Sequence, residues 1–140
     1  MKGLHMYTPP GARASAAAYR QVDLNSQVLS TSPHGLIGLL FKELRSCLQG
    51  AMAAIGRQDV AAKVRLIGKA SRLIDEGLMS SLDVGAGGEV AANLQRLYSY
   101  CLLRIAHANA RNDEAALQEV LTLLEPVIDG WSQIGTRAAA

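Results

Sequence analysis

Few side chains in this sequence have the type and spacing that catalysis or metal binding requires. The three histidines are far apart: His5 lies in an N-terminal tail, His34 in the first turn of an expected helix, and His107 on the polar side of a later one. None has the HxxxH or ExxH spacing that places two ligands on one helix face. Asp75 and Glu76 are adjacent and therefore point to different faces of a helix. We expect no catalytic residue, no metal ion and no cofactor, so the sequence does not predict an enzyme.

The cysteines, the charge pattern and the hydropathy narrow the class of protein further. Cys47 and Cys101 occupy apolar positions of helical patterns without a CxxC motif, which predicts buried, reduced thiols. The net charge of +2 is spread thinly, with no run of Lys or Arg, so no nucleic-acid partner is expected. The stretch TPPG interrupts the apolar residues near the N-terminus, and no apolar run reaches about 18 residues. We therefore expect a cytoplasmic protein without a membrane span.

Apolar residues at helical spacing dominate the chain and predict an all-α fold. With 140 residues, 49% of them hydrophobic and 19% charged, the chain is long enough for one domain with its own core. We expect a flexible tail at 1–13, a helical domain at 14–135 and a disordered C-terminal tail at 136–140. Four long helices with short connections are typical of an antiparallel up-down four-helix bundle, preceded here by a short additional N-terminal helix at about 14–24.

Capping residues predict where the long helices begin. Ser32, with Pro33 at the first helical position, starts the first long helix. Asp59 caps the second, which should fade near Leu82. The glycines of DVGAGGEV predict a turn, so the third long helix should run from Glu89 to about residue 110.

The last helix carries a proline within its pattern. Asn112 or Asp113 should cap this helix, because both residue types accept a hydrogen bond from a free backbone N–H. Pro126 lacks a backbone donor and is expected to kink the helix or to split it near Leu123.

Helical projection assigns one apolar face to each long helix. The predicted core residues are Leu36, Ile37, Leu40, Leu44, Cys47, Leu48, Ala51, Ile55, Val60, Val64, Ile67, Ile74, Leu78, Val90, Leu94, Leu97, Tyr98, Cys101, Leu102, Ile105, Ala116, Val120, Leu123, Leu124, Val127 and Trp131. Because Tyr98 and Tyr100 are two positions apart, they point nearly opposite ways, and Tyr100 and Leu103 should lie on the outer arc. Leu66 and Leu73 lie beside the apolar face of the second long helix.

Two blocks of the sequence resemble the FliS family of flagellar export chaperones. The first is AYRQVDLNSQVLSTSPHGLIGLLFKEL, with its tyrosine, its Ser-Pro helix start and its leucine-rich face. The second runs from Gly87 to Trp131 and contains Asn-Leu, Leu-Tyr-x-Tyr, Ala-Asn, Asn-Asp and a closing Trp in the family's order. The resemblance extends over residues 18–131, which is most of the chain.

This resemblance implies a helical bundle that binds the disordered C-terminal segment of flagellin, prevents its premature polymerisation and keeps it competent for flagellar type III secretion. In the family the bound segment wraps around the bundle as short helices and extended pieces. The chaperone's own N-terminal segment occupies part of that surface when flagellin is absent. Tyr19, Val22 and Leu24 are therefore candidates for a self-capping segment, and permanent packing of these residues on the bundle is an equal alternative.

The residues that the core does not require suggest where a guest would bind. Our hypothesis is a flagellin-binding groove that includes Tyr100, Leu103, Leu66 and Leu73, because an amphipathic guest needs a second apolar stripe. One alternative is a helical adaptor of the flagellar export machinery that does not itself hold flagellin. Another is a four-helix-bundle enzyme or metal carrier. A homodimer, and contacts with export-apparatus and regulatory flagellar proteins, stay open.

Overall fold

The computed structural model describes residues 32–139, with side chains through residue 134, and every element in this part of the chain is helical. The elements are α2 (Pro33–Gly56), α3 (Val60–Arg72), the π-helix η1 (Leu73–Met79), α4 (Val84–Arg111) and α5 (Glu114–Ala139). The predicted all-α class is confirmed. The short helix predicted at about 14–24 lies outside the described residues. The described residues belong to two compact units, one ending at Leu36 and the other beginning at Ile37.

Three predicted caps hold the starts of the helices. The Ser32 hydroxyl accepts a hydrogen bond from the backbone N–H of Gly35 at 3.1 Å, and Pro33 is the first helical residue. The carboxylates of Asp59 and Asp113 each accept from the backbone N–H three residues further on, at 3.1 Å and 3.2 Å. Each cap satisfies a donor that has no partner within its own helix. Asp113 is therefore the cap of α5, and Asn112 belongs to the end of α4.

The turns that follow α2 and α4 have the same construction. Gln58 and Asn112 both adopt the left-handed conformation, with φ of 60° and 52°. The next backbone N–H, of Asp59 or Asp113, then returns to a carbonyl in the last turn of the helix, at 2.8 Å and 3.1 Å. This pattern ends a helix and reverses the chain within a few residues.

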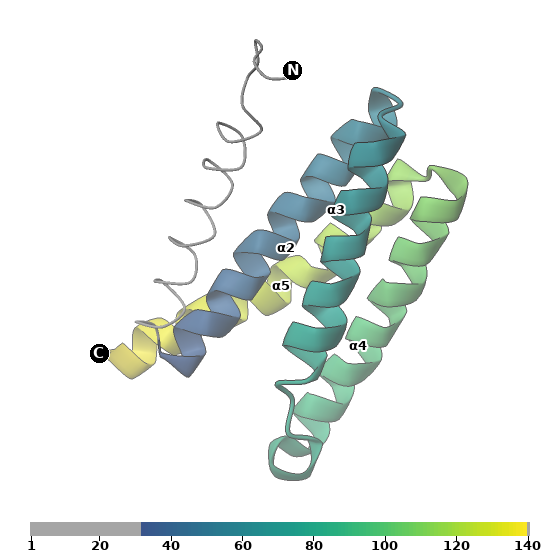
Figure 1. Ribbon diagram of the computed structural model, residues 1–140. Helices are drawn as coiled ribbons and strands as arrows, with labels where there is room; N and C mark the ends of the chain where they lie inside the picture. Colours follow the sequence, from purple (N-terminus) through teal and green to yellow (C-terminus); the bar gives the residue numbers. More distant parts are fainter. Residues whose placement is uncertain (1–31, 140) are drawn as a thin grey trace, which may run out of the picture. The chain divides into compact units, whose positions relative to one another are not determined.

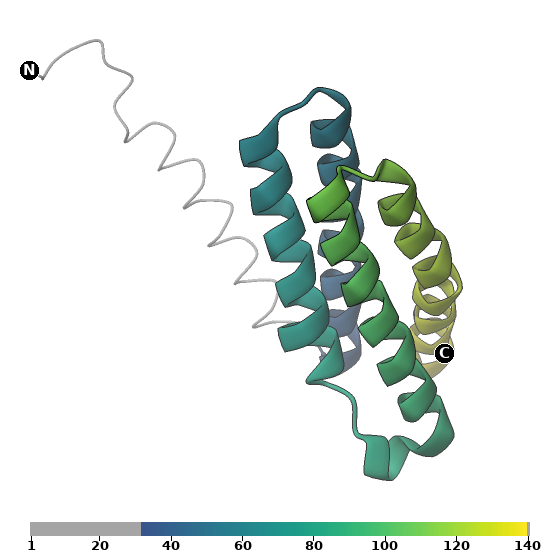
Figure 2. The same ribbon diagram turned by 90° about the vertical axis from the view of Figure 1, so that its right-hand side faces the viewer.

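The glycine-rich stretch at 83–90 was predicted to form a turn between helices. The structure breaks the helix there at Gly88, and the residues just before the break form a helical turn. The Asp83 carboxylate caps a single helical turn at Val84–Gly87 by accepting from the backbone N–H of Ala86 at 3.0 Å. Gly88 then breaks the helix with φ of 60° and ψ of −134°, and the helix resumes at Glu89. Figure 2 shows this break as a hook at the lower end of α4. Glycine adopts this conformation without the steric cost that a Cβ would bring.

The second long helix changes its winding before it ends. Arg72 is the last α-helical residue, and η1 continues with π-helical hydrogen bonding to Met79, close to the predicted end near Leu82. The wider π turn keeps Ile74 and Leu78 in the core, at 0% and 1% exposure. Helical periodicity did not predict this change.

Helix α5 continues through its proline. Pro126 lies inside a single helix that extends to Ala139, so the predicted split near Leu123 is wrong. The helix also continues through residues 136–139, which were predicted to belong to a disordered C-terminal tail. An exposed proline costs one hydrogen bond, and the core contacts of Leu121 and Leu124 on the preceding turn offset that loss.

Helix η1 continues α3, both contact α4, and α4 contacts α5 (Figures 1 and 2). Cross-helix contacts join α2 to α3 through Glu43 and Lys69, at 2.6 Å, and α2 to α5 through Arg45 and Glu125, at 2.9 Å. The core between the helices consists of Phe41, Leu44, Cys47, Leu48, Ala51, Ile67, Ala70, Ile74, Leu78, Tyr98, Cys101, Ile105, Ala108, Ala116, Leu117, Val120, Leu121 and Leu124. Most of these residues were predicted from the apolar faces.

Three predicted core valines are exposed instead. Val60 and Val64 are 64% and 51% exposed, and Val90 is 70% exposed. On α3 the buried stripe passes through Lys63 and Ile67, so the two valines lie beside it. The hydrophobicity pattern missed this because it excludes a lysine from the core. Val90 follows the break at Gly88 in an exposed part of α4.

Candidate binding surface

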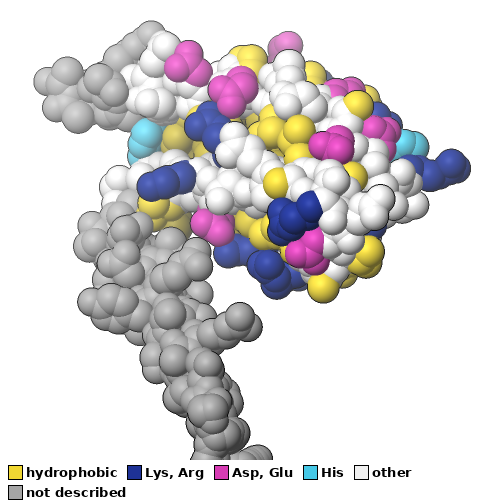
Figure 3. All heavy atoms as spheres, turned by 90° about the horizontal axis from the view of Figure 1, so that it is seen from above, with side chains coloured by type: hydrophobic (Ala, Val, Ile, Leu, Met, Phe, Trp, Pro, Cys, Tyr) yellow, Lys and Arg dark blue, Asp and Glu magenta, His cyan; other side chains and the backbone are white. Residues whose placement is uncertain are grey.

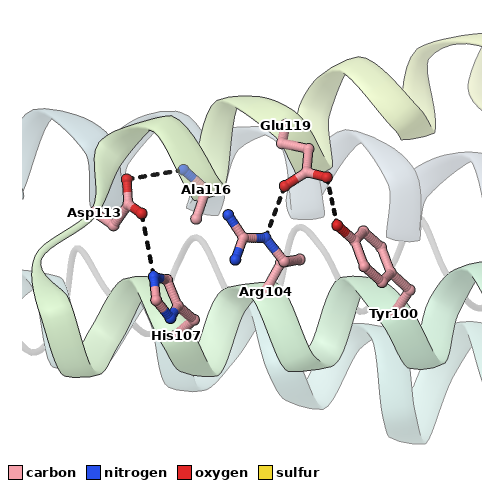
Figure 4. Close-up of polar contacts among 6 residues, drawn as sticks. All are labelled: Tyr100, Arg104, His107, Asp113, Ala116 and Glu119. Carbon is pink, nitrogen blue, oxygen red and sulfur yellow. Dashed lines mark hydrogen bonds and ion pairs between the residues drawn. The ribbon is translucent and has the colours of Figure 1, made fainter.

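The two tyrosines of α4 lie in different environments, as predicted. Tyr98 is 3% exposed and belongs to the core, and burial raises the pKa of its hydroxyl to about 12. Tyr100 is 43% exposed and projects from α4 toward α5 (Figure 4). The fold therefore requires the first ring for packing, whereas the second ring lies at the surface.

A carboxylate on α5 binds the Tyr100 hydroxyl. Tyr100 Oη donates to Glu119 Oε2 at 2.6 Å, and Arg104 Nε donates to Glu119 Oε1 at 2.7 Å (Figure 4). The hydrogen bond to Glu119 raises the pKa of Tyr100, and the bonds from Tyr100 and Arg104 lower the pKa of Glu119. We call these three residues the polar strap, because they join α4 to α5 outside the core.

A second polar contact joins the same two helices one turn further on. His107 Nε2 lies 3.3 Å from Asp113 Oδ2, while Asp113 Oδ1 accepts from the backbone N–H of Ala116 (Figure 4). Asp113 therefore caps α5 and faces α4 at once. His107 lies on the polar side of α4, as predicted, and contributes an ion pair when its imidazole is protonated.

Leu103 is the most exposed leucine of the predicted groove. It is 70% exposed, three residues after Tyr100 on α4. A single exposed leucine is ordinary on a protein surface. Together with the ring of Tyr100 it provides apolar surface next to the polar strap.

Leu66 lies at a different seam from Tyr100, and Leu73 follows it on η1. Both are partly buried against the core. A Cβ placed on Gly50 of α2 would lie 3.0 Å from Cδ1 of Leu66, so Leu66 fills the close approach of α2 and α3. The structure thus places two of the four predicted groove residues at different helix pairs: Tyr100 of α4 faces α5, and Leu66 of α3 faces α2.

Two hollows on the surface were not predicted. One, of about 380 Å³, lies between α2 and α5 and is lined by Gln49, Met52, Gln118, Leu121, Thr122 and Glu125. The other, of about 420 Å³, lies where the turn after α2 meets the end of α4. The second contains Lys63, a lysine on an otherwise apolar helical stripe. The lysine within this apolar stripe is the feature of the sequence that could have indicated the second hollow.

The cysteines and the side chains that could bind a metal ion are the other candidates for a functional site. Cys47 and Cys101 are free and buried, as predicted. Burial raises the pKa of both thiols, that of Cys101 to about 11. Within residues 32–139, no group of three or more His, Cys, Asp or Glu side chains is placed to hold a metal ion, and no helix has the length and apolarity to cross a membrane. Tyr19, Val22 and Leu24 lie outside the described residues.

Exposed apolar side chains along the seams of a helical domain are typical of a protein that binds other polypeptide chains. The family model described as flagellar protein FliS matches residues 15–138. The chain therefore belongs to the FliS family.

Relatives named as flagellar secretion chaperones match nearly the whole chain. FliS of Salmonella typhimurium strain LT2 is 42% identical over 134 residues, covering 96% of each chain. FliSB of Pseudomonas aeruginosa PAO1 is 43% identical over 116 residues, covering 83% of this chain and 91% of the relative. FliS of Escherichia coli K12 is 34% identical over 128 residues, covering 91% of both.

Proposed function

We propose that this protein is a cytoplasmic export chaperone that binds the C-terminal segment of flagellin, prevents premature polymerisation and keeps the segment competent for flagellar type III secretion. The observation that carries the proposal is the 42% identity over 96% of the chain to a flagellar secretion chaperone. A function of this kind needs binding surface and no catalytic group. The protein is accordingly proposed not to be an enzyme.

The proposal includes the full architecture expected from the sequence. The helices α2 to α5 would form an antiparallel up-down bundle within a single domain at 14–135, with a short additional N-terminal helix. Tyr19, Val22 and Leu24 on that helix would cover part of the guest surface until flagellin displaces them.

We propose that the guest contacts Tyr100 and Leu103 at one seam and Leu66 and Leu73 at the other. A single short helix cannot lie on both seams, because the polar strap faces α5 whereas Leu66 faces α2. A segment that wraps around the bundle as several short pieces can contact both. The partial burial of Leu66 and Leu73 makes them shallow contacts, and the 70% exposure of Leu103 makes it the strongest candidate of the four.

The decisive measurement is calorimetry with a C-terminal flagellin peptide and a pair of matched variants. Leu103→Asp places a charge in the proposed contact and should weaken binding by about tenfold or more, equivalent to about 1.4 kcal/mol. Val90→Asp is the control, because Val90 lies on the same helix with the same 70% exposure and outside the proposed groove. It should bind as the parent does.

The outcomes separate this proposal from its rivals. Coupled folding of the guest should give a large negative heat-capacity change. The absence of heat with the parent protein would contradict the chaperone proposal and favour an adaptor that does not hold flagellin. Equal weakening by both aspartates would show that charge on α4 matters in general and would remove Leu103 from the site.

A further inference from the structure

The cavity of about 420 Å³ lies at the end of the bundle that holds both helix-reversing turns. Its lining consists of Ala54, Ile55, Gln58, Asp59, Val60, Lys63 and Asn112. Figure 3 looks onto this end, where hydrophobic side chains reach the surface between separate basic and acidic ones. The lining thus combines an apolar wall with a few polar groups, as in sites for small ligands.

Lys63 is the buried polar group of this cavity. It is 8% exposed, and its ammonium donates to the backbone carbonyl of Asn109 at 3.0 Å and to Asn112 Oδ1 at 2.7 Å. An ammonium has three N–H donors, and these two bonds use two of them. Both acceptors are neutral, so the hydrogen bonds leave the positive charge without a counter-charge in direct contact.

No carboxylate among the described residues forms an ion pair with Lys63. Asp59 also lines the cavity, but its Oδ1 accepts from the backbone N–H of Ala62 and its Oδ2 from Arg57 at 3.4 Å. These bonds lower the pKa of Asp59, that from Ala62 most. The C-terminal dipole of α4 offsets part of the lysine charge. The remainder favours an anion in the cavity, because an unpaired buried charge is costly.

The backbone of the cavity is unusual in the same place. Gln58 and Asn112 are the non-glycine residues with positive φ in the described part of the chain, and both line the cavity. Asparagine tolerates this conformation, whereas glutamine gains nothing local from it. Both residues end a helix in this conformation, and the two turns form part of the wall of the cavity.

We propose that this cavity binds a carboxylate of a bound polypeptide, with Lys63 as the charged contact and Ile55 and Val60 as the wall for an adjacent apolar side chain. The proposal rests on the proposed function for the source of the peptide, since the guest chain would supply the carboxylate. An aspartate or glutamate side chain and a free C-terminus offer the same group. The two sources are distinguished by experiment.

The first experiment titrates three small peptides into the full chain and follows the backbone amide NMR signals of residues 58–63 and 112. The probes are N-acetyl-leucyl-leucine, with a free C-terminal carboxylate, N-acetyl-aspartyl-leucinamide, with a side-chain carboxylate, and N-acetyl-leucyl-leucinamide, with none. We expect saturable shifts with at least one of the first two and none with the third. Shifts with only one carboxylate probe identify the source. Equal responses to all three, or none, would overturn the proposal.

The second experiment uses a charge at the mouth of the cavity, because replacing Lys63 itself removes two hydrogen bonds and risks unfolding. Val60→Asp adds a carboxylate at a 64% exposed position that lines the cavity, at the start of α3, where the helix dipole favours an acid. It should weaken the carboxylate probe's binding by about tenfold. Val64→Asp, one turn further on and outside the cavity lining, is the matched control and should bind the probe normally.

These outcomes are separate from the test of the chaperone function. If flagellin does not bind but the carboxylate probes do, the cavity assignment holds and the source of its ligand must be another peptide. If flagellin binds and Val60→Asp leaves both the probe and flagellin affinities unchanged, the cavity is not a carboxylate site.

Discussion

Two helical hairpins with nearly identical turns are held together by different means. In the hairpin of α2 with α3 and η1, leucines fill close approaches to glycines: Leu66 packs at Gly50, and Leu40 at Gly77. In the hairpin of α4 and α5, the polar strap of Tyr100, Arg104 and Glu119 supplements the core from outside. Each seam also carries an ion pair, Glu43–Lys69 in the first and Arg104–Glu119 in the second. The seams therefore differ in the leucine–glycine packing of the first and in the tyrosine hydroxyl bond of the second.

The difference indicates what each seam can offer to a guest. We call the contact of α2 with α3 and η1 the glycine seam, and the contact of α4 with α5 the strap seam. Leu66 and Leu40 already fill the glycine seam, so a guest meets a shallow surface there. The strap seam keeps an aromatic ring and Leu103 at the surface while the hydroxyl of Tyr100 stays bonded. Substitutions at the two seams should therefore have different effects. A substitution at the glycine seam should change the free energy of unfolding, whereas one at the strap seam should change the pKa of Glu119 with little effect on folding.

The largest expected effect is on the glycine seam. Gly50→Val should lower the free energy of unfolding by about 1–3 kcal/mol, because the new side chain overlaps Leu66, whose Cδ1 would lie 3.0 Å from the added Cβ. Urea unfolding followed by circular dichroism measures the change. Gly50→Ala should cost less, since the end of the leucine side chain can rotate away.

Gly38→Val is the matched control for this substitution. Gly38 lies on the same helix, and a Cβ there meets nothing within 4 Å. Its unfolding free energy should change by less than about 0.5 kcal/mol. A similar loss in both variants would mean that the cost does not come from the contact with Leu66, since valine is the better helix former of the two residue types.

The two turns provide a smaller effect with opposite sign. Gln58→Gly should raise the free energy of unfolding by about 0.5–1 kcal/mol, because glycine relieves the left-handed strain at φ of 60° and offsets its own entropy cost. Asn112→Gly should give no gain, since Asn112 tolerates this conformation and its Oδ1 accepts from Lys63. Thermal unfolding of the two variants side by side tests this difference. Stabilisation by both would show that the Lys63 bond contributes little.

The sequence predicted the helices and their caps because these depend on local chemistry. Ser32, Asp59 and Asp113 act on donors three residues away, and the broad apolar faces recur at helical spacing. It also placed Tyr98 inside and Tyr100 outside. The helical fold of the described region therefore followed from patterns within single segments.

What the sequence did not predict depends on contacts between segments. Lys63 is buried on α3 while the neighbouring valines are exposed, because its ammonium donates hydrogen bonds to a carbonyl and an amide oxygen at the end of α4. The partner of Tyr100 is 19 residues away on another helix. Leu66 meets Gly50, which lies on another helix. Periodicity gives the direction of a side chain but not the residue that it meets.

The smallest expected effect concerns the polar strap. Tyr100→Phe keeps the ring and removes the hydroxyl that donates to Glu119, so the pKa of Glu119 should rise from its lowered value toward the ordinary one, while the bond from Arg104 keeps it below that. A carboxylate with a lowered folded-state pKa stabilises the fold above its unfolded pKa, and the contribution disappears as the pH falls through the folded pKa. The variant should therefore lose less stability than the parent on acidification below the ordinary glutamate pKa.

Carbon-13 NMR of the Glu119 carboxyl measures the pKa directly, and acid unfolding curves give the stability. Glu119→Gln is the control for the unfolding curves, because it removes the titrating carboxyl. In that background, Tyr100→Phe should no longer change how much stability is lost on acidification. An unchanged pKa of Glu119 in Tyr100→Phe would show that the hydroxyl bond does not persist in solution. In that case the Tyr100 side chain is free to turn, and both its ring and its hydroxyl become available to a guest.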